Sequence, residues 1–177
     1  RGEPAESWRP APLYRLARTV AVMPIDSRMI DNMKADRVRK VADLANRRTR
    51  ERFGRFLIEG PQSVREAVTW MPDVVRDLYV QAVDGPRIAG ETLTSIVERS
   101  QEHRIYVHPA SEAVMRRISP DCQGIAAVGD ADAVRATAQG TQLPEKPFVA
   151  AFWQVRDPGN AGTVIRAADA AGCDAVV

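Results

Sequence analysis

The stretch VRDPGNAGTVIRAADAAG, residues 155–172, joins two apolar segments of the sequence. The apolar run Phe148–Trp153 before it predicts a β-strand, and Asp174–Val177 after it predicts the opening of another. Between them, the Asp-Pro-Gly-Asn run predicts a tight turn, and Ala161–Ala171 predicts a helix that Asn160 can cap through its side-chain oxygen. A strand, a helix and a second strand predict a β-α-β unit, in which ligands bind at the carboxyl ends of the strands.

Before this unit, apolar periodicity predicts four further strands and four helices. The strands are expected at Arg55–Glu59, Asp77–Val80, Arg104–Val107 and Gly124–Val128. The helices are expected at 36–53, where Gly54 ends the helix, and at Ser63–Met71, Glu91–His103 and Ser111–Ile118. Alternation of strands and helices with short links predicts an α/β sandwich with a mostly parallel sheet.

Composition and apolar density divide the chain into four parts. We expect an N-terminal extension at 1–33, a first α/β domain at 34–130, a linker at 131–147 and a second domain that begins at 148–177. A parallel sheet needs more strands than this last part predicts to bury both of its faces, so we expect the second domain to continue beyond Val177.

The bulk composition indicates a soluble globular protein. The chain is 45% hydrophobic and 27% charged, and it has no apolar run near the roughly 20 residues that cross a bilayer. The N-terminus has no signal-peptide pattern, so we expect a cytoplasmic protein without a membrane partner. Cys122 and Cys173 are expected to be free thiols, and His103 and His108 to be ordinary surface or strand-edge residues. No spacing of these residues predicts a metal site.

Positive charge is concentrated in one segment. From Lys34 to Arg55 there are nine Lys or Arg against three Asp or Glu, whereas the net charge of the whole chain is +2. Such a cluster is typical of a surface that binds a polyanion, although arginine-rich solvated helices are also common. The aromatic residues Phe53 and Phe56 in this segment suit either a core or a base-stacking surface. Phe152 and Trp153 are expected in a core.

Two motifs resemble those of a known family. Asn160-x-Gly-x-x-x-Arg166, preceded by Asp-Pro-Gly and followed by Gly172, resembles the first signature motif of the SpoU (TrmH-type) RNA ribose 2′-O-methyltransferases of the SPOUT superfamily. Val38–Val68, which contains the run RFLIEGP, and Gln123–Val128 resemble the start and the last strand of that family's RNA-binding domain.

The resemblance implies a ribosomal-protein-like α/β sandwich that binds RNA, followed by the start of an α/β-knot methyltransferase domain. It implies S-adenosylmethionine as methyl donor, a homodimer, and RNA as substrate, with large-subunit ribosomal RNA preferred and transfer RNA as the alternative. Asn160 and Arg166 would line the active site. Arg47, Arg48, Arg50 and Arg52 would contact RNA phosphates.

The resemblance also implies where the cofactor site lies. The family's later motifs, which supply most of the cofactor pocket, would follow Val177. We therefore expect the isolated 177-residue chain to bind RNA without transferring methyl groups.

Other interpretations of the motif remain open. Asn160 suits a plain helix cap, and Arg166 suits a surface ion pair with Asp169. On one helix, six residues separate Asn160 from Arg166 by about 9 Å and place them on different faces, so a shared site needs Asn160 in the turn or a second chain. A guanidinium is a poor general base, which favours alkoxide stabilisation or phosphate binding for Arg166. The rival functions are a non-catalytic RNA-binding module and an α/β enzyme of another class.

Overall fold

The computed structural model describes residues 25–139, 142–155 and 157–177, which form two compact units. Unit 1 ends at Asp130, and unit 2 comprises Ala131–Val177. Most of the expected extension, together with residues 140–141 of the expected linker and Arg156 of the motif, lies outside the described residues. The first part of the expected linker forms helix α6 (Ala131–Gln139).

Unit 1 is built on a five-stranded mixed sheet with the order β1-β5-β2-β3, in which β4 also pairs with β2. The strands are β1 (Arg55–Glu59), β2 (Val75–Asp84), β3 (Arg87–Ile88), β4 (Tyr106–Ala110) and β5 (Ile125–Asp130). Among the named strands of unit 1, β2 and β4 pair in parallel, whereas β5 runs antiparallel to both β1 and β2. The expected mostly parallel sheet is therefore wrong, because β5 enters between β1 and β2 and reverses the direction of both pairings.

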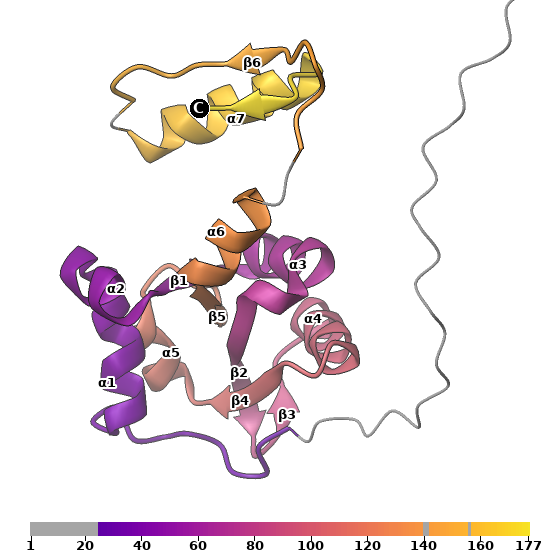
Figure 1. Cartoon of the computed structure of the whole chain (residues 1–177). Helices are drawn as coiled ribbons and strands as arrows, with labels where there is room; N and C mark the ends of the chain where they lie inside the picture. The colour runs from indigo at the N-terminus through magenta and orange to yellow at the C-terminus, as the bar shows by residue number, and fades with distance from the viewer. Residues whose placement is uncertain (1–24, 140–141, 156) are drawn as a thin grey trace, which may run out of the picture. The chain divides into compact units, whose positions relative to one another are not determined.

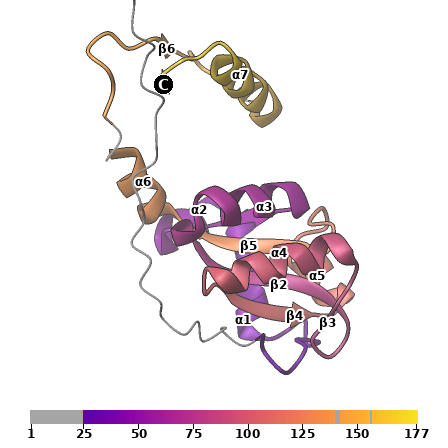
Figure 2. The ribbon, with the colours of Figure 1, turned by 90° about the vertical axis from the view of Figure 1, so that its right-hand side faces the viewer.

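Helices cover both faces of this sheet, as Figures 1 and 2 show. They are α1 (Asp36–Ala42), the 3-10 helix η1 (Asp43–Ala45), α2 (Arg47–Phe53), α3 (Pro61–Trp70), the 3-10 helix η2 (Pro72–Val74), α4 (Glu91–Glu102) and α5 (Glu112–Ile118). One core lies between the sheet and α3 and α4, and it contains Val64, Val68, Leu78 and Ile96. The other lies between the sheet and α1 and α5, and it contains Val38, Tyr79, Val114 and Met115. Because strand side chains alternate between faces, Leu78 and Tyr79 serve opposite cores.

The expected continuous helix at 36–53 is interrupted. Asn46 has an extended backbone (φ −85°, ψ 128°), and its side chain accepts a hydrogen bond from the Arg48 N–H. Asparagine favours this N-cap geometry over the interior of a helix, so the chain turns after η1 and begins α2. Gly54, in the left-handed conformation (φ 59°), ends α2 where the sequence predicted.

Residues 25–33 run beside β4. The Ile30 N–H donates to the Pro109 carbonyl at 2.8 Å, and the Ser111 N–H donates to the Ile30 carbonyl at 2.8 Å. Part of the expected extension is thus attached to unit 1. Its Asp26 carboxylate lies 3.7 Å from His108 Nδ1.

His108 is buried rather than at the surface, which corrects the sequence-based expectation; only His103 is exposed. The His108 ring lies between the rings of Tyr79 and Tyr106, with centroid distances of 4.8 and 4.6 Å. Nε2 lies 2.9 Å from Asp77 Oδ1, and Nδ1 lies 3.1 Å from Arg37 Nη1. An arginine can only donate, so Nδ1 accepts and Nε2 carries the proton.

Unit 2 contains α6, β6 (Val149–Ala150), α7 (Pro158–Ala170) and β7 (Ala175–Val176). Strands β6 and β7 are parallel, which confirms the β-α-β order, although both strands are shorter than expected. The expected core position of Trp153 is wrong, because its side chain is 87% exposed. It follows the short β6 in a bend, where no second layer of the described part of unit 2 covers it.

Gly129 provides a test of packing within the sheet. It pairs with Phe56 across β1 and β5, and a Cβ at Gly129 would lie 2.4 Å from the Phe56 ring. Gly129→Ala is expected to lower the free energy of unfolding by roughly 1–3 kcal/mol, because the ring would have to move. Urea unfolding measures this change. In a Phe56→Ala background the same substitution should cost almost nothing, and an equal cost in both backgrounds would contradict this explanation.

Candidate functional site

Helix α2 is the most exposed part of the basic segment. None of its seven residues is buried, so α2 packs little against the rest of unit 1. Four of these residues are arginines. The Asn46 cap fixes where this helix begins, and Gly54 fixes where it ends. The two boundaries of α2 therefore determine where its four arginines lie.

The four predicted phosphate-binding arginines differ in their contacts. The Arg50 guanidinium donates to the Leu44 and Ala45 carbonyls at 2.9 and 2.7 Å, and so caps the C-terminal end of η1. Arg47 pairs with Glu51 at 2.7 Å, and this carboxylate raises the pKa of Arg47. The Arg48 side chain is exposed and contacts no partner among the described residues. The Arg48 guanidinium is thus not held by a carboxylate, as Arg47 is, or by carbonyls, as Arg50 is.

The remaining arginine lies beside an exposed aromatic ring. The guanidinium carbon of Arg52 lies 5.2 Å from the centre of the Phe53 ring, within cation–π range. The Phe53 side chain is 54% exposed, whereas Phe56 is half-buried against Gly129. Of the two aromatic residues left open by the sequence, Phe53 is the one available to a ligand.

Phe53 also borders a groove of about 360 Å³, which we call the α1–α2 groove. Its lining residues come from α1, η1, α2 and the sheet: Lys40, Val41, Leu44, Phe53, Arg55, Asp77 and Val128. Sequence reasoning did not single out Lys40 or Asp77, although Lys40 belongs to the basic segment. Asp77 could not have been found, because only the fold brings this strand residue to the helices.

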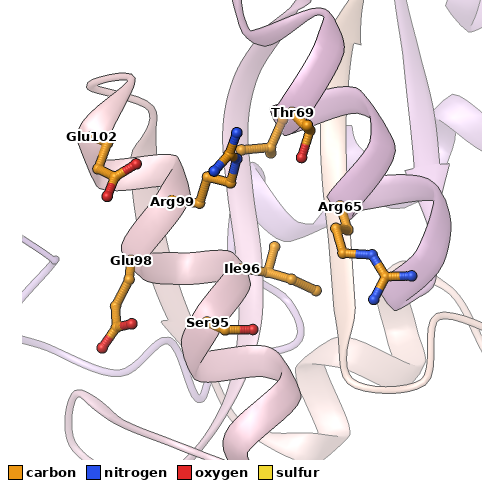
Figure 3. Close-up of a pocket in the computed structure, with 8 residues that line it drawn as sticks. Arg65, Thr69, Ser95, Ile96, Glu98, Arg99 and Glu102 are labelled. Carbon is orange, nitrogen blue, oxygen red and sulfur yellow. The ribbon is translucent and has the colours of Figure 1, made fainter.

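A second groove, of about 470 Å³, lies between α3 and α4 on the other face of the sheet. Figure 3 shows Arg99 reaching from α4 toward Thr69 on α3, while Glu98 and Glu102 point to the outer side of α4. Arg65 lies on the α3 side of the same groove. Its lining combines side chains of both charges with the apolar Val68 and Ile96. Trp70, at the end of α3, is 76% exposed but is not one of its lining residues.

The motif in unit 2 is arranged around the start of α7. The Asp157 side chain accepts a hydrogen bond from the Asn160 N–H at 2.7 Å, so Asp157 rather than Asn160 is the N-cap. The helix begins at Pro158, three residues before the predicted start, with proline at a position where its missing N–H costs nothing. Asn160 therefore lies inside the helix, and its exposed side chain is not needed as a cap.

Arg166 folds back along the same helix. Its Nη2 donates to Thr163 Oγ1 at 3.2 Å, and no ion pair joins it to Asp169 within the described part of unit 2. A Cβ at Gly162 would lie 3.4 Å from Arg166 Nη1. Because glycine has no side chain, the guanidinium of Arg166 has space beside position 162. Because a helical side chain points toward the N-terminus, the guanidinium approaches the level of Asn160 more closely than the backbone separation suggests.

Two features are absent from the part of the chain that the structure describes. Within residues 25–139, 142–155 and 157–177, no group of three or more His, Cys, Asp or Glu could hold a metal ion. The helices of the same residues include none that is long and apolar enough to span a membrane.

Both cysteines are free, and burial raises the pKa of the Cys122 thiol. Cys122 is therefore a poor nucleophile at neutral pH.

Comparison with known proteins places these features in a family context. The MRM3-like substrate binding domain matches residues 35–127. The 23S rRNA (guanosine(2553)-2′-O)-methyltransferase RlmP of Bacillus subtilis (strain 168) is 34% identical over 155 residues, which are 85% of this chain and 54% of RlmP. The chain thus spans about half the length of this relative.

Solved structures show the same architecture. An RNA 2′-O ribose methyltransferase is similar with a TM-score of 0.63 and 24% identity over 84% of this chain and 54% of that one. A TrmH-family putative RNA methyltransferase from Porphyromonas gingivalis has a TM-score of 0.59 and 26% identity, covering 82% of this chain and 51% of its own. The SpoU methyltransferase AviRb from Streptomyces viridochromogenes, solved with AdoMet, has a TM-score of 0.57 and 24% identity, covering 81% and 52%.

Proposed function

Because this chain belongs to the SpoU (TrmH-type) family of RNA methyltransferases and carries an MRM3-like substrate-binding domain, we propose that its protein methylates a ribose 2′-hydroxyl of RNA. Large-subunit ribosomal RNA is the preferred substrate, since the relative RlmP is named for 23S rRNA. The observation that carries the proposal is the coincidence of two features. The matched residues 35–127 contain the arginine helix α2, and Asn160 and Arg166 lie on the exposed surface of α7.

Unit 1 would supply most of the affinity for RNA. Arg48 and Arg52 are exposed on α2 and pair with no carboxylate among the described residues, whereas Arg47 pairs with Glu51. Contacts from such arginines to phosphates are independent of base sequence and weaken with salt. Arg50 contributes differently, because its guanidinium is already held by two backbone carbonyls.

Unit 2 would supply the groups that act on the ribose. A 2′-hydroxyl must lose its proton as the oxygen attacks, so negative charge develops on that oxygen. The guanidinium of Arg166 suits the stabilisation of this charge or the binding of the neighbouring phosphate. Asn160 can donate through its amide to a ribose oxygen or orient the RNA backbone. The proton acceptor is then a group other than Arg166.

The methyl donor proposed is S-adenosylmethionine, whose sulfonium supplies an electrophilic methyl group; the relative AviRb was solved with AdoMet. The guanidinium of Arg166 suits the substrate side of this reaction, because it would repel a sulfonium cation. We therefore assign Asn160 and Arg166 to the ribose and not to the cofactor.

We also propose that the protein acts as a homodimer in the cytoplasm. Asn160 and Arg166 are exposed on one helix, and neither contacts the other. Unit 2 also exposes large apolar side chains, including Phe148, Trp153 and Ile165, at 58, 87 and 49%. Exposed apolar groups of this size mark an interface, and a second chain could complete the site. Light scattering on the complete gene product measures its oligomeric state.

Methyl transfer tests the proposed function directly. The complete gene product is incubated with labelled S-adenosylmethionine and unmodified ribosomal RNA, and the modified nucleoside is identified. Label in a ribose 2′-O-methyl group at one position supports the proposal. Binding to ribosomal and transfer RNA without any label would reduce the function to that of an RNA-binding module.

The arginines of α2 are expected to separate into two classes. Arg48→Ala should weaken RNA binding and reduce the magnitude of the salt slope, d log K/d log[salt], by about 0.7 for each lost contact to a single strand. Arg50→Ala should leave that slope nearly unchanged and lower the melting temperature, because two carbonyls of η1 lose their donor. Fluorescence anisotropy at several salt concentrations and thermal unfolding measure these effects. The reverse pattern would contradict the division between a phosphate-binding Arg48 and a structural Arg50.

A further inference from the structure

The geometry points to the α1–α2 groove as a pocket for one unstacked nucleotide of single-stranded RNA. This inference rests on the proposed RNA-binding function, and it adds the location of the site and the chemical class of its ligand. Phosphate contacts alone would not need a groove. The pocket depends on the floor of the groove, its aromatic wall and the charges at its edge.

The floor is apolar and the wall is aromatic. Val41, Leu44 and Val128 line the groove with exposures of 7, 4 and 6%, so they form a firm surface that a flat ring can cover. Phe53 stands at the same groove with 54% of its surface exposed. An exposed phenylalanine contributes little to the stability of its own fold, because its ring is not buried. Stacking with a base would bury this ring, and aromatic side chains stack with bases of any sequence.

The charges favour a nucleotide in one orientation. Lys40 lines the groove and has no ion pair within the described residues, whereas Arg55, which also lines it, is held by Asp130 at 2.5 Å. Arg52 lies over the Phe53 ring, so α1 and α2 each provide a cationic group, one in the lining of the groove and one beside its aromatic wall. A phosphate would be attracted to this edge of the groove.

Asp77 excludes the opposite orientation. Its carboxylate lines the groove, is 40% exposed, and accepts a hydrogen bond from His108 through Oδ1. A carboxylate repels a phosphate but accepts hydrogen bonds from the N–H groups on the edge of a base. The base therefore points toward Asp77, and the phosphate lies toward Lys40 and α2.

The groove between α3 and α4 lacks this combination. Its lining includes two glutamates, which Figure 3 shows, and no aromatic side chain is among its lining residues. Trp70 nearby is 76% exposed, so its ring is accessible enough to stack with a base. Unlike Phe53, however, it does not border an apolar floor. Trp70 is therefore a matched control for Phe53.

Binding of the 177-residue chain to a labelled single-stranded hexanucleotide RNA tests the pocket by fluorescence anisotropy. Phe53→Ala is expected to weaken binding roughly tenfold while leaving the salt slope unchanged, because a stacking contact releases no counterions. Phe53→Trp should retain the affinity, and Phe53→Leu should behave like Phe53→Ala. Trp70→Ala should bind as the unmodified chain does. A hexanucleotide of abasic sites should not distinguish Phe53→Ala from the unmodified chain.

The outcomes separate this inference from the proposed function. If Phe53→Ala binds normally while Arg48→Ala weakens binding, the chain binds RNA but the nucleotide pocket is refuted. If Trp70→Ala weakens binding as much as Phe53→Ala, the effect is not specific to this groove and the pocket is also refuted. If the unmodified chain binds no RNA, the proposed function itself falls.

Discussion

Replacing Arg166 by alanine in the complete gene product is expected to lower the rate of methyl transfer to ribosomal RNA by roughly 10²- to 10³-fold. This range is what the loss of one donor to a developing oxyanion costs in other enzymes. The affinity for RNA should fall far less than the rate, because most of the proposed phosphate contacts lie on α2. Single-turnover transfer of labelled methyl groups measures the rate, and anisotropy measures the affinity.

The side chain of Arg166 has few contacts that its replacement could disturb. Its side chain is exposed, and its one hydrogen bond among the described residues is to Thr163 Oγ1 on the same helix. Arg166→Ala should therefore keep the melting temperature, and a large drop in that temperature would show that the residue is structural. Arg166→Lys keeps the charge but loses the planar fork of donors, so only part of the activity should return.

Substitutions at two neighbours of Arg166 serve as controls, because each should disturb its guanidinium less than Arg166→Ala does. Thr163→Val removes the hydroxyl that holds the guanidinium and should lower the rate less than Arg166→Ala does. Gly162→Ala introduces a methyl group 3.4 Å from Nη1 and should displace the guanidinium slightly. Full activity of Arg166→Ala would exclude Arg166 from the reaction and leave the motif with a structural role.

Local signals in the sequence predicted the elements whose ends are marked by glycine or proline. Strand β1 begins and ends at the predicted residues because Gly54 and Gly60 bound it. Helix α3 begins at Pro61, two residues before the predicted Ser63. In α7 the same logic favoured Asn160 as the cap. The side chain of Asp157 occupies that role because the helix begins at Pro158.

Features that depend on distant residues could not be predicted in this way. The position of β5 between β1 and β2 leaves no local trace, since the strand is apolar whichever direction it runs. The burial of His108 depends on Arg37 and Asp77, which lie 71 and 31 positions away in the sequence. The groove beside Phe53 depends on the same long-range arrangement, because Asp77 and Val128 come from the sheet.

A buried carboxylate at the end of β5 is expected to be the polar group on which unit 1 depends most. Asp130 is 4% exposed and accepts hydrogen bonds from Arg76 Nε and Nη2 at 2.9 and 2.5 Å. Arg55 Nη1 lies 2.5 Å from the same oxygen. These residues come from the first position of β1, the second position of β2 and the last position of β5, so one carboxylate joins three strands.

The irregular pairing of β2 explains how Arg76 reaches this carboxylate. The register between β2 and β5 passes from Val75–Gly129 to Asp77–Val128, which leaves Arg76 without a partner across the strands. Such a bulge changes the direction of a side chain. It turns Arg76 toward Asp130 at the edge where β5 ends.

Asp130→Asn is therefore expected to lower the free energy of unfolding by roughly 2–3 kcal/mol, because two arginines lose a charged acceptor. The figure lies below the range for fully buried pairs, since the side chains of Arg55 and Arg76 are 37 and 53% exposed and can turn to water. Urea unfolding followed by circular dichroism measures the change. Glu51→Gln makes the same carboxylate-to-amide replacement in an exposed pair with Arg47 and should cost far less, because water screens that pair. Equal costs for the two variants would mean that Asp130 is no more than another surface charge, and that the three strands are held by their apolar faces alone.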